Sequence, residues 1–75
     1  MIQTAVTSSN IAHLGWEAET LFIKFNNGKS YSYPDVPMNV YNEFVDAPSA
    51  GKHFHAEIKA KFVAVPLQHD PFTAA

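Results

Sequence analysis

The 75-residue sequence predicts a small α+β domain, in which a three-stranded antiparallel β-meander, with or without an extra N-terminal strand, packs against two C-terminal α-helices. The first observation is the strand-like pattern of residues 20–25. The second is the Asn26-Asn27-Gly28 turn that follows it, and the third is the change after Pro37 to apolar residues at helical spacing.

The first strands are expected before residue 17. Residues 1–9 contain a short apolar–polar alternation that suits an edge strand, which is the extra N-terminal strand. Residues 11–16 form the next predicted strand, with Leu14 and Trp16 on one face. Gly15 between them indicates either a β-bulge or a close backbone approach.

Residues 20–25 form the clearest predicted strand, because β-branched and aromatic residues dominate it. Its apolar face holds Leu21, Ile23 and Phe25, and Lys24 lies on the other face.

The Asn26-Asn27-Gly28 segment predicts a hairpin, because Asn-Gly tolerates the positive φ angles of a type I′ turn. The returning strand covers residues 29–33, and Tyr31 and Tyr33 share one of its faces.

Two helices are expected after Pro34, which ends the last strand. Pro37 suits the first turn of the first helix, and Asp35 lies where a carboxylate meets the positive end of the helix dipole. Ala47-Pro48 ends this helix, because the residue before a proline is pushed out of the α region.

Ser49 is the predicted N-cap of the second helix, with a buried stripe of Phe54, Ile58 and Phe62 at i, i+4, i+8 spacing. Residues 63–65 either extend this helix or form a short strand. The domain is therefore predicted to span residues 1–65, and residues 66–75 form a tail that is mobile or docked on a surface.

Composition limits the classes of function. The chain has no cysteine, so disulfides and thiolate metal sites are excluded. Neither a leader segment nor a membrane-length apolar run is found, and we expect a soluble cytoplasmic protein. The net charge is -2 with no arginine, which argues against strong nonspecific nucleic-acid binding but permits a local basic face.

No catalytic residue, metal site or cofactor is predicted. His53 and His55 would lie about 200° apart on a helix, so they do not converge on one metal ion. No serine lies in a Gly-x-Ser-x-Gly elbow, and the three glycines are isolated rather than grouped in a phosphate-binding loop. We therefore expect a protein that is not an enzyme.

Two groups of residues are candidate ligand sites. Tyr31 and Tyr33 could stack nucleic-acid bases, with Lys24 and Lys29 contacting phosphates; the alternative is that both rings cover the helices as part of the core. Ser49 and Lys52, at the start of the second helix, could bind a phosphate or carboxylate. Their alternative is a capped helix with a solvated lysine.

The order of short motifs along residues 6–62 resembles the KTSC domain family. These motifs are Ser8-Ser9, Leu14-Gly15-Trp16, Leu21-x-Ile23-x-Phe25, Gly28, Tyr31-x-Tyr33, Val36-Pro37, Val40-Tyr41, Ala47, Ser49-x-Gly51-Lys52-x-Phe54 and Ile58. The family takes its name from a C-terminal module of some lysyl-tRNA synthetases and occurs mostly as small proteins of bacteria and their phages. The resemblance implies a small module, and the attachment to synthetases suggests RNA binding.

Two functions from different classes stay open at this point. The first is a non-catalytic RNA-binding module that uses Tyr31, Tyr33, Lys24, Lys29, Ser49 and Lys52. The alternative is a phage- or bacteria-encoded factor that binds or inhibits a host protein through an aromatic surface and residues 66–75. Either protein would act as a monomer or a homodimer and would not contact a membrane. Its expected location is the cytoplasm, which is the host cytoplasm if a phage encodes the protein.

Overall fold

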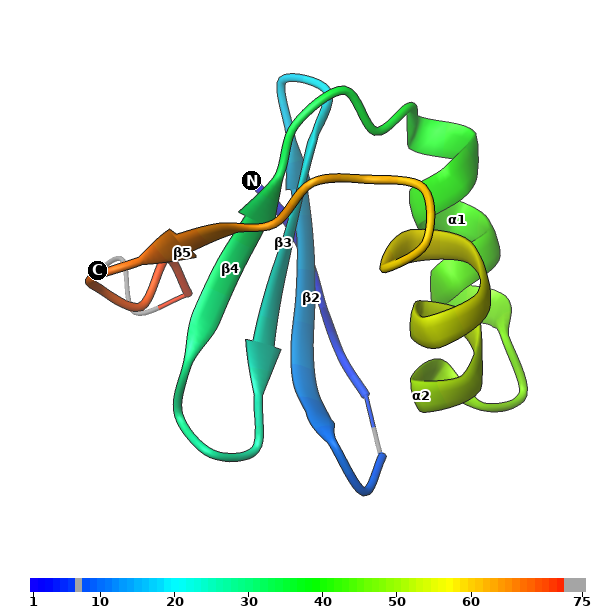
Figure 1. The fold of residues 1–75 in the computed structure, drawn as a ribbon, viewed down its shortest axis with the longest axis horizontal. Helices are drawn as coiled ribbons and strands as arrows, with labels where there is room; N and C mark the ends of the chain where they lie inside the picture. The colour runs from blue at the N-terminus through cyan, green and yellow to red at the C-terminus, as the bar shows by residue number, and fades with distance from the viewer. Residues whose placement is uncertain (7, 73–75) are drawn as a thin grey trace.

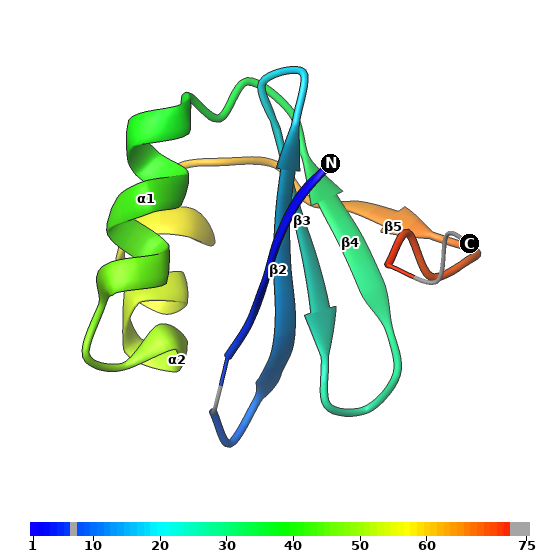
Figure 2. The same cartoon turned by 180° about the vertical axis from the view of Figure 1, so that it is seen from behind.

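The structure is a computed structural model that describes residues 1–6 and 8–72. A five-stranded antiparallel sheet follows the order of the sequence, β1-β2-β3-β4-β5, and the helices cover one of its faces (Figure 1, Figure 2). The elements are β1 Ile2–Ala5, β2 Ile11–Glu17, β3 Thr20–Phe25, β4 Ser30–Tyr33, α1 Met38–Asp46, α2 Ala50–His53, the π-helix η1 Phe54–Ile58 and β5 Val65–Leu67.

The predicted α+β class, the meander and the two helices are confirmed, and β1 is the extra N-terminal strand. The sheet differs from the prediction by a fifth strand, β5, which pairs with β4 and places Pro66 opposite Tyr31. A proline is tolerated there because β5 is an edge strand. β5 crosses the expected boundary between residues 65 and 66. Residues 73–75 of the expected tail lie outside the described residues.

A β-bulge in β2 lets two core residues with odd spacing share one face. Ile11 pairs with Phe25 and His13 pairs with Lys24, so Ala12 is the extra residue. Ile11 and Leu14 are consequently both buried against the helices. The bulge offered as one interpretation of Gly15 therefore lies at Ala12 instead, and the atoms that approach Gly15 belong to the side chains of Phe72 and Met1, not to another backbone segment.

The two hairpin turns of the meander have different backbone conformations, and the type I′ turn predicted at residues 26–28 is not found there. Ala18 and Glu19, between β2 and β3, have φ angles of 51° and 60°, which is the pattern of a two-residue type I′ turn. In the β3–β4 hairpin the Phe25 N–H donates to the Lys29 carbonyl (2.9 Å), which leaves a three-residue turn of residues 26–28. The Gly28 N–H donates to the Phe25 carbonyl (3.0 Å), and within the turn Gly28 alone has positive φ (89°). The hairpin at residues 26–28 is thus confirmed, but its assignment to type I′ is wrong.

The core lies between the sheet and the helices. Its buried members are Ile11, Leu14, Leu21, Ile23, Tyr33, Val36, Tyr41, Phe44, Phe54 and Ile58. A hydrogen bond of 2.8 Å between the Thr4 and Tyr41 hydroxyls joins β1 to α1. This bond fixes the first helix over the edge of the sheet.

The predicted start of α2 and the predicted end of α1 at Ala47 are found, but the predicted role of Asp35 at the start of α1 is not. Ser49 caps α2 as predicted, its Oγ accepting from the Lys52 N–H at 3.4 Å. α1 has Pro37 at its N-cap and no acidic residue in its first turn. Asp35 instead holds a left-handed conformation, φ 62°, in the loop before the helix. Its predicted role at the helix dipole is therefore wrong.

Candidate binding groove

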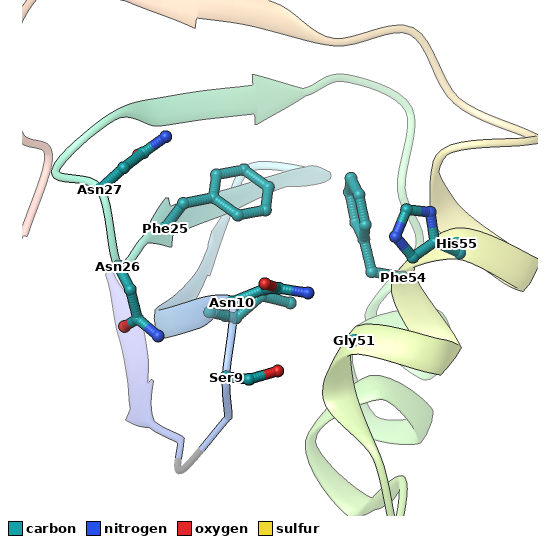
Figure 3. Close-up of a pocket in the computed structure, with 9 residues that line it drawn as sticks. Ser9, Asn10, Phe25, Asn26, Asn27, Gly51, Phe54 and His55 are labelled. Atoms are coloured by element: carbon teal, nitrogen blue, oxygen red, sulfur yellow. The ribbon is translucent and has the colours of Figure 1, made fainter.

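Three adjoining pockets form a groove where the sheet opens away from α2 and η1. The central pocket has a volume of about 410 Å³ and is shown in Figure 3. Its lining residues are Ser9, Asn10, Ile11, Phe25, Asn26, Asn27, Gly51, Phe54 and His55. It shares residues with both other pockets, so the three are treated as one groove.

The loop before β2 forms one rim of the central pocket and is held by four hydrogen bonds. The Ser8 hydroxyl accepts from the backbone N–H groups of Asn10 (3.2 Å) and Ile11 (3.3 Å). Asn26, in the next hairpin, donates its backbone N–H to the Asn10 carbonyl (2.8 Å) and its side-chain amide to the Ser8 carbonyl (2.9 Å). The rim is therefore ordered before any ligand binds.

Aromatic rings form the wall of the central pocket. Phe25 of β3 and Phe54 of η1 meet edge to face, with ring centroids 5.4 Å apart. Figure 3 shows the two rings facing one another above the Asn10 side chain, whose amide extends toward the helical layer. The His55 ring lies 5.4 Å from Phe54. The central pocket thus combines flat apolar ring faces with an amide group on one surface.

The groove continues past Phe25 to a pocket of about 390 Å³, here called the tyrosine end. It is lined by Phe25, Asn27, Tyr31, Tyr33, Phe54, Lys59, Phe62 and Ala64. Tyr33 is 3% exposed and packs against Phe54, whereas Tyr31 is half-buried and meets Phe25 edge to face at 5.6 Å. Burial, with a smaller contribution from Tyr31, raises the pKa of Tyr33 to about 12. Tyr33 is therefore a core ring, and Tyr31 presents the accessible aromatic surface.

On its other side the groove reaches a pocket of about 510 Å³, the lysine end. Ser9, Asn10, Ser49, Gly51, Lys52, His55 and Ala56 line it. The Ser49 oxygen is already engaged in capping α2, so Lys52 supplies the charge at this end.

Four of the six predicted site residues line the groove: Tyr31, Tyr33, Ser49 and Lys52. Lys24 does not, because its side chain lies on the face of the sheet opposite the helices, where it pairs with Asp70. Lys29 is exposed beside the β3–β4 turn and does not line the groove.

The length of the β3–β4 turn explains why Lys24 and the two tyrosines lie on opposite faces of the sheet. In a two-residue Asn27-Gly28 turn, Lys24 would pair with Tyr31 and share its face. The observed three-residue turn pairs Lys24 with Ser30 and Ile23 with Tyr31. A one-residue shift moves every side chain of the strand to the other face, so both tyrosines face the helices.

Sequence reasoning missed Asn10, Phe25, Phe54 and His55 as groove residues. Periodicity shows which face of an element a ring occupies, and it assigned Phe25 and Phe54 to the core. Periodicity does not show where the sheet and the helices move apart, and so it does not show which core rings are exposed at the edge of the groove.

The charged side chains that line the groove are basic, although the chain carries a net charge of -2. None of the residues that line its three pockets is acidic, and Lys52, Lys59 and His55 are among them. Within residues 1–6 and 8–72, no three His, Cys, Asp or Glu side chains are grouped so as to hold a metal ion. No helix among these residues is long and apolar enough to cross a membrane.

Comparison with known proteins gives a consistent result. The KTSC domain model matches residues 7–62. The crystal structure of a KTSC domain protein from Yersinia pestis superposes with a TM-score of 0.81 at 31% identity, covering 87% of this chain and 94% of that chain. A protein of Stutzerimonas stutzeri is 34% identical over 61 residues, covering 79% of this chain and 86% of its own length.

A lysine–tRNA ligase of Trichormus variabilis is 46% identical over 44 residues, which is 59% of this chain but 8% of the ligase. A lysine–tRNA ligase of Nostoc punctiforme is 44% identical over 46 residues, again 8% of the ligase. The chain thus corresponds to a small segment of these enzymes, and the resemblance inferred from the sequence is confirmed.

Proposed function

Because the chain belongs to the KTSC domain family, we propose that it is a small non-catalytic module that binds single-stranded RNA in the groove between its sheet and its second helical segment. The observation that carries this proposal is the groove itself. Aromatic rings line its centre, lysines lie at both ends, and no acidic side chain lines its pockets.

This combination suits single-stranded RNA better than other anions. Unpaired bases stack on aromatic side chains and place their edges within reach of amides, while lysines contact the phosphates. Tyr31 and Phe25 offer the ring surfaces, and Asn10 offers an amide between them and Lys52. The match to a segment of lysine–tRNA ligases, which act on RNA, supports the same choice of ligand.

Binding should be of modest affinity and modest salt dependence, since two lysines of the described residues, Lys52 and Lys59, line the groove and would meet phosphates. For two phosphate contacts on a single strand, the slope of log affinity against log salt is about -1.4. A rise from about 50 to 200 mM salt would then weaken binding roughly sevenfold.

The test is fluorescence anisotropy with a short unstructured RNA and a matched pair of lysine variants. Lys52→Gln should weaken binding and reduce the salt slope by about 0.7, while Lys24→Gln, on the opposite face, should change neither. Tyr31→Ala should weaken binding about 5- to 150-fold, since stacking contributes ~1–3 kcal/mol per base. Equal effects of both lysine variants, or no binding at about 50 mM salt, would reject the groove as an RNA site.

A protein partner is the second candidate, and one observation favours it. Val63 is 75% exposed and precedes Ala64 of the tyrosine end, so it adds apolar surface beside the rings. A stoichiometric partner that survives nuclease treatment, and is lost with Val63→Asp, would support this alternative. Origin in a phage and action in the cytoplasm stay predictions.

A further inference from the structure

The face of the sheet that points away from the helices holds a second, unrelated contact site. The C-terminal segment after β5 folds back beside the sheet on the side opposite the helices (Figure 1, Figure 2). The outer socket, as we name it, consists of His13 and Gly15 of β2 and Lys24 of β3. Residues 70–72, with the sequence Asp-Pro-Phe, contact all three members.

Phe72 fits the socket because Gly15 has no side chain. A Cβ atom built on Gly15 would lie 2.7 Å from Cε1 of Phe72, closer than carbon atoms approach without displacement. The Phe72 ring is also stacked at a tilt on His13, with centroids 5.5 Å apart and planes at 31°. The same Cβ would lie 3.0 Å from Met1 Sδ, so the glycine makes room for the aromatic ring beside the Met1 side chain, and the imidazole covers that ring.

Asp70 supplies the polar half of the contact. Its Oδ2 accepts from Lys24 Nζ at 2.5 Å, and its Oδ1 accepts from the Phe72 backbone N–H at 2.8 Å. One carboxylate thus pairs with the socket lysine and also bends the segment so that Phe72 turns back toward Gly15. An acidic residue two positions before an aromatic one is what this geometry requires.

Two buried polar atoms of the sheet near the socket have no hydrogen-bond partner in the described part of the chain. Ser30, next to Lys24 in the sheet, is 5% exposed, and its Oγ has no hydrogen-bond partner in the described part of the chain. The buried Nδ1 of His13 has none either. Since unpaired buried polar atoms cost free energy, a longer peptide that satisfied them would bind more favourably than the chain's own segment.

We propose that the outer socket is a peptide-binding site for an Asp-Pro-Phe segment of a partner protein, with residues 70–72 of this chain as the resident competitor. Charge complementarity at Lys24 and the ring-sized space above Gly15 select the motif. The site lies on the face opposite the RNA groove, so the failure of either proposal leaves the other untouched.

The experiment uses the full-length chain with its own segment disabled. In the Asp70→Asn/Phe72→Ala variant the socket residues are intact but the competitor is weakened. Adding the peptide Gln-His-Asp-Pro-Phe, which corresponds to residues 68–72, should shift the backbone amide resonances of His13, Gly15 and Lys24. The wild-type chain should bind it at least tenfold more weakly, because a tethered segment competes at an effective concentration near the millimolar range.

Two controls decide the result. Peptides with alanine in place of phenylalanine, or asparagine in place of aspartate, should shift these resonances at least tenfold less. Gly15→Ala introduced into the opened variant should abolish binding, since the new Cβ occupies the ring position. Binding that ignores both peptide changes, or shifts confined to the RNA groove, would overturn the proposal.

A single substitution keeps the proposal testable if the opened variant does not fold. Gly15→Ala in the otherwise native chain should release residues 70–72, seen as loss of the nuclear Overhauser contacts between Phe72 and His13. Retention of those contacts would overturn the socket. Concentration-dependent dimerisation of the native chain without peptide binding would assign the surface to a second copy, and would overturn it too.

Discussion

The indole Nε1–H of Trp16 donates a hydrogen bond of 2.8 Å to the backbone carbonyl of Val36. The backbone N–H of Val36 donates in turn to the Glu19 carbonyl, also at 2.8 Å. Both backbone groups of one loop residue are therefore bonded to the β2–β3 hairpin, and the Val36 side chain is fully buried. This double contact fixes the path of the chain from the sheet to α1.

Trp16→Phe should accordingly destabilise the protein by about 1–2 kcal/mol, because it leaves the Val36 carbonyl without its donor. In a domain of this size that corresponds to a melting temperature lower by roughly 4–16 °C. Thermal unfolding followed by far-UV circular dichroism measures the change. An unaltered melting temperature would mean that water replaces the indole at no cost.

The β2–β3 turn should be open to stabilisation, since Ala18 and Glu19 both hold positive φ angles, 51° and 60°. The double substitution Ala18→Asn/Glu19→Gly introduces the Asn-Gly dipeptide that favours a type I′ turn. We expect the free energy of unfolding to rise by about 0.5–1 kcal/mol, measured by urea denaturation.

The matched control for the turn is Glu17→Gly, one residue outside it. Glu17 belongs to β2, where the backbone is extended and glycine costs roughly 0.5–1 kcal/mol. Opposite signs for the two glycine substitutions would show that backbone conformation, and not loss of a glutamate, decides the result. Two destabilised variants would contradict the turn assignment.

Tyr33 should titrate at a distinctly alkaline pH, because burial, with a smaller contribution from Tyr31, raises its pKa to about 12 from an ordinary value of 10.0. The unfolded chain releases this proton first, so the stability of the fold should decrease between about pH 10 and 12. Absorbance at the phenolate band, compared between wild type and Tyr33→Phe, isolates this group. Tyr33→Phe should remove the phenolate transition near pH 12. If it removes a transition near pH 10 instead, the raised pKa of Tyr33 is refuted.

The contact of residues 70–72 with the sheet should weaken in acid. The hydrogen bond from Lys24, and next the Phe72 N–H, lower the pKa of Asp70 below its ordinary value of 3.8. A lowered folded-state pKa gives stabilisation that is present above about pH 3.8 and is lost as the pH falls through the folded-state value. Chemical shifts of Phe72 should report release of the segment in that range.

Asp70→Asn is the control for this acid transition. The segment should then show no pH dependence over the same range, because the titrating carboxylate is gone. A transition of equal size in the variant would assign the effect to another group.

Local chemistry in the sequence was enough to predict the first four strands and the two helical segments. Alternation predicted the buried face of β3, and the Ser49 cap and the Phe54–Ile58 spacing predicted the second helical segment. These features depend on residues close together in the chain, so a short window contains their cause. The same applies to Tyr31 and Lys52, whose residue types suggested ligand contacts.

Only the tertiary structure decided which face the tyrosines occupy, the presence of the fifth strand and the position of the two candidate binding surfaces. A single additional residue in the β3–β4 turn set the register that separates Tyr31 from Lys24. The role of Gly15 in the outer socket is visible only because Phe72, 57 positions later in the chain, packs onto it. Such contacts depend on how distant segments meet in space, and no short stretch of sequence contains that information.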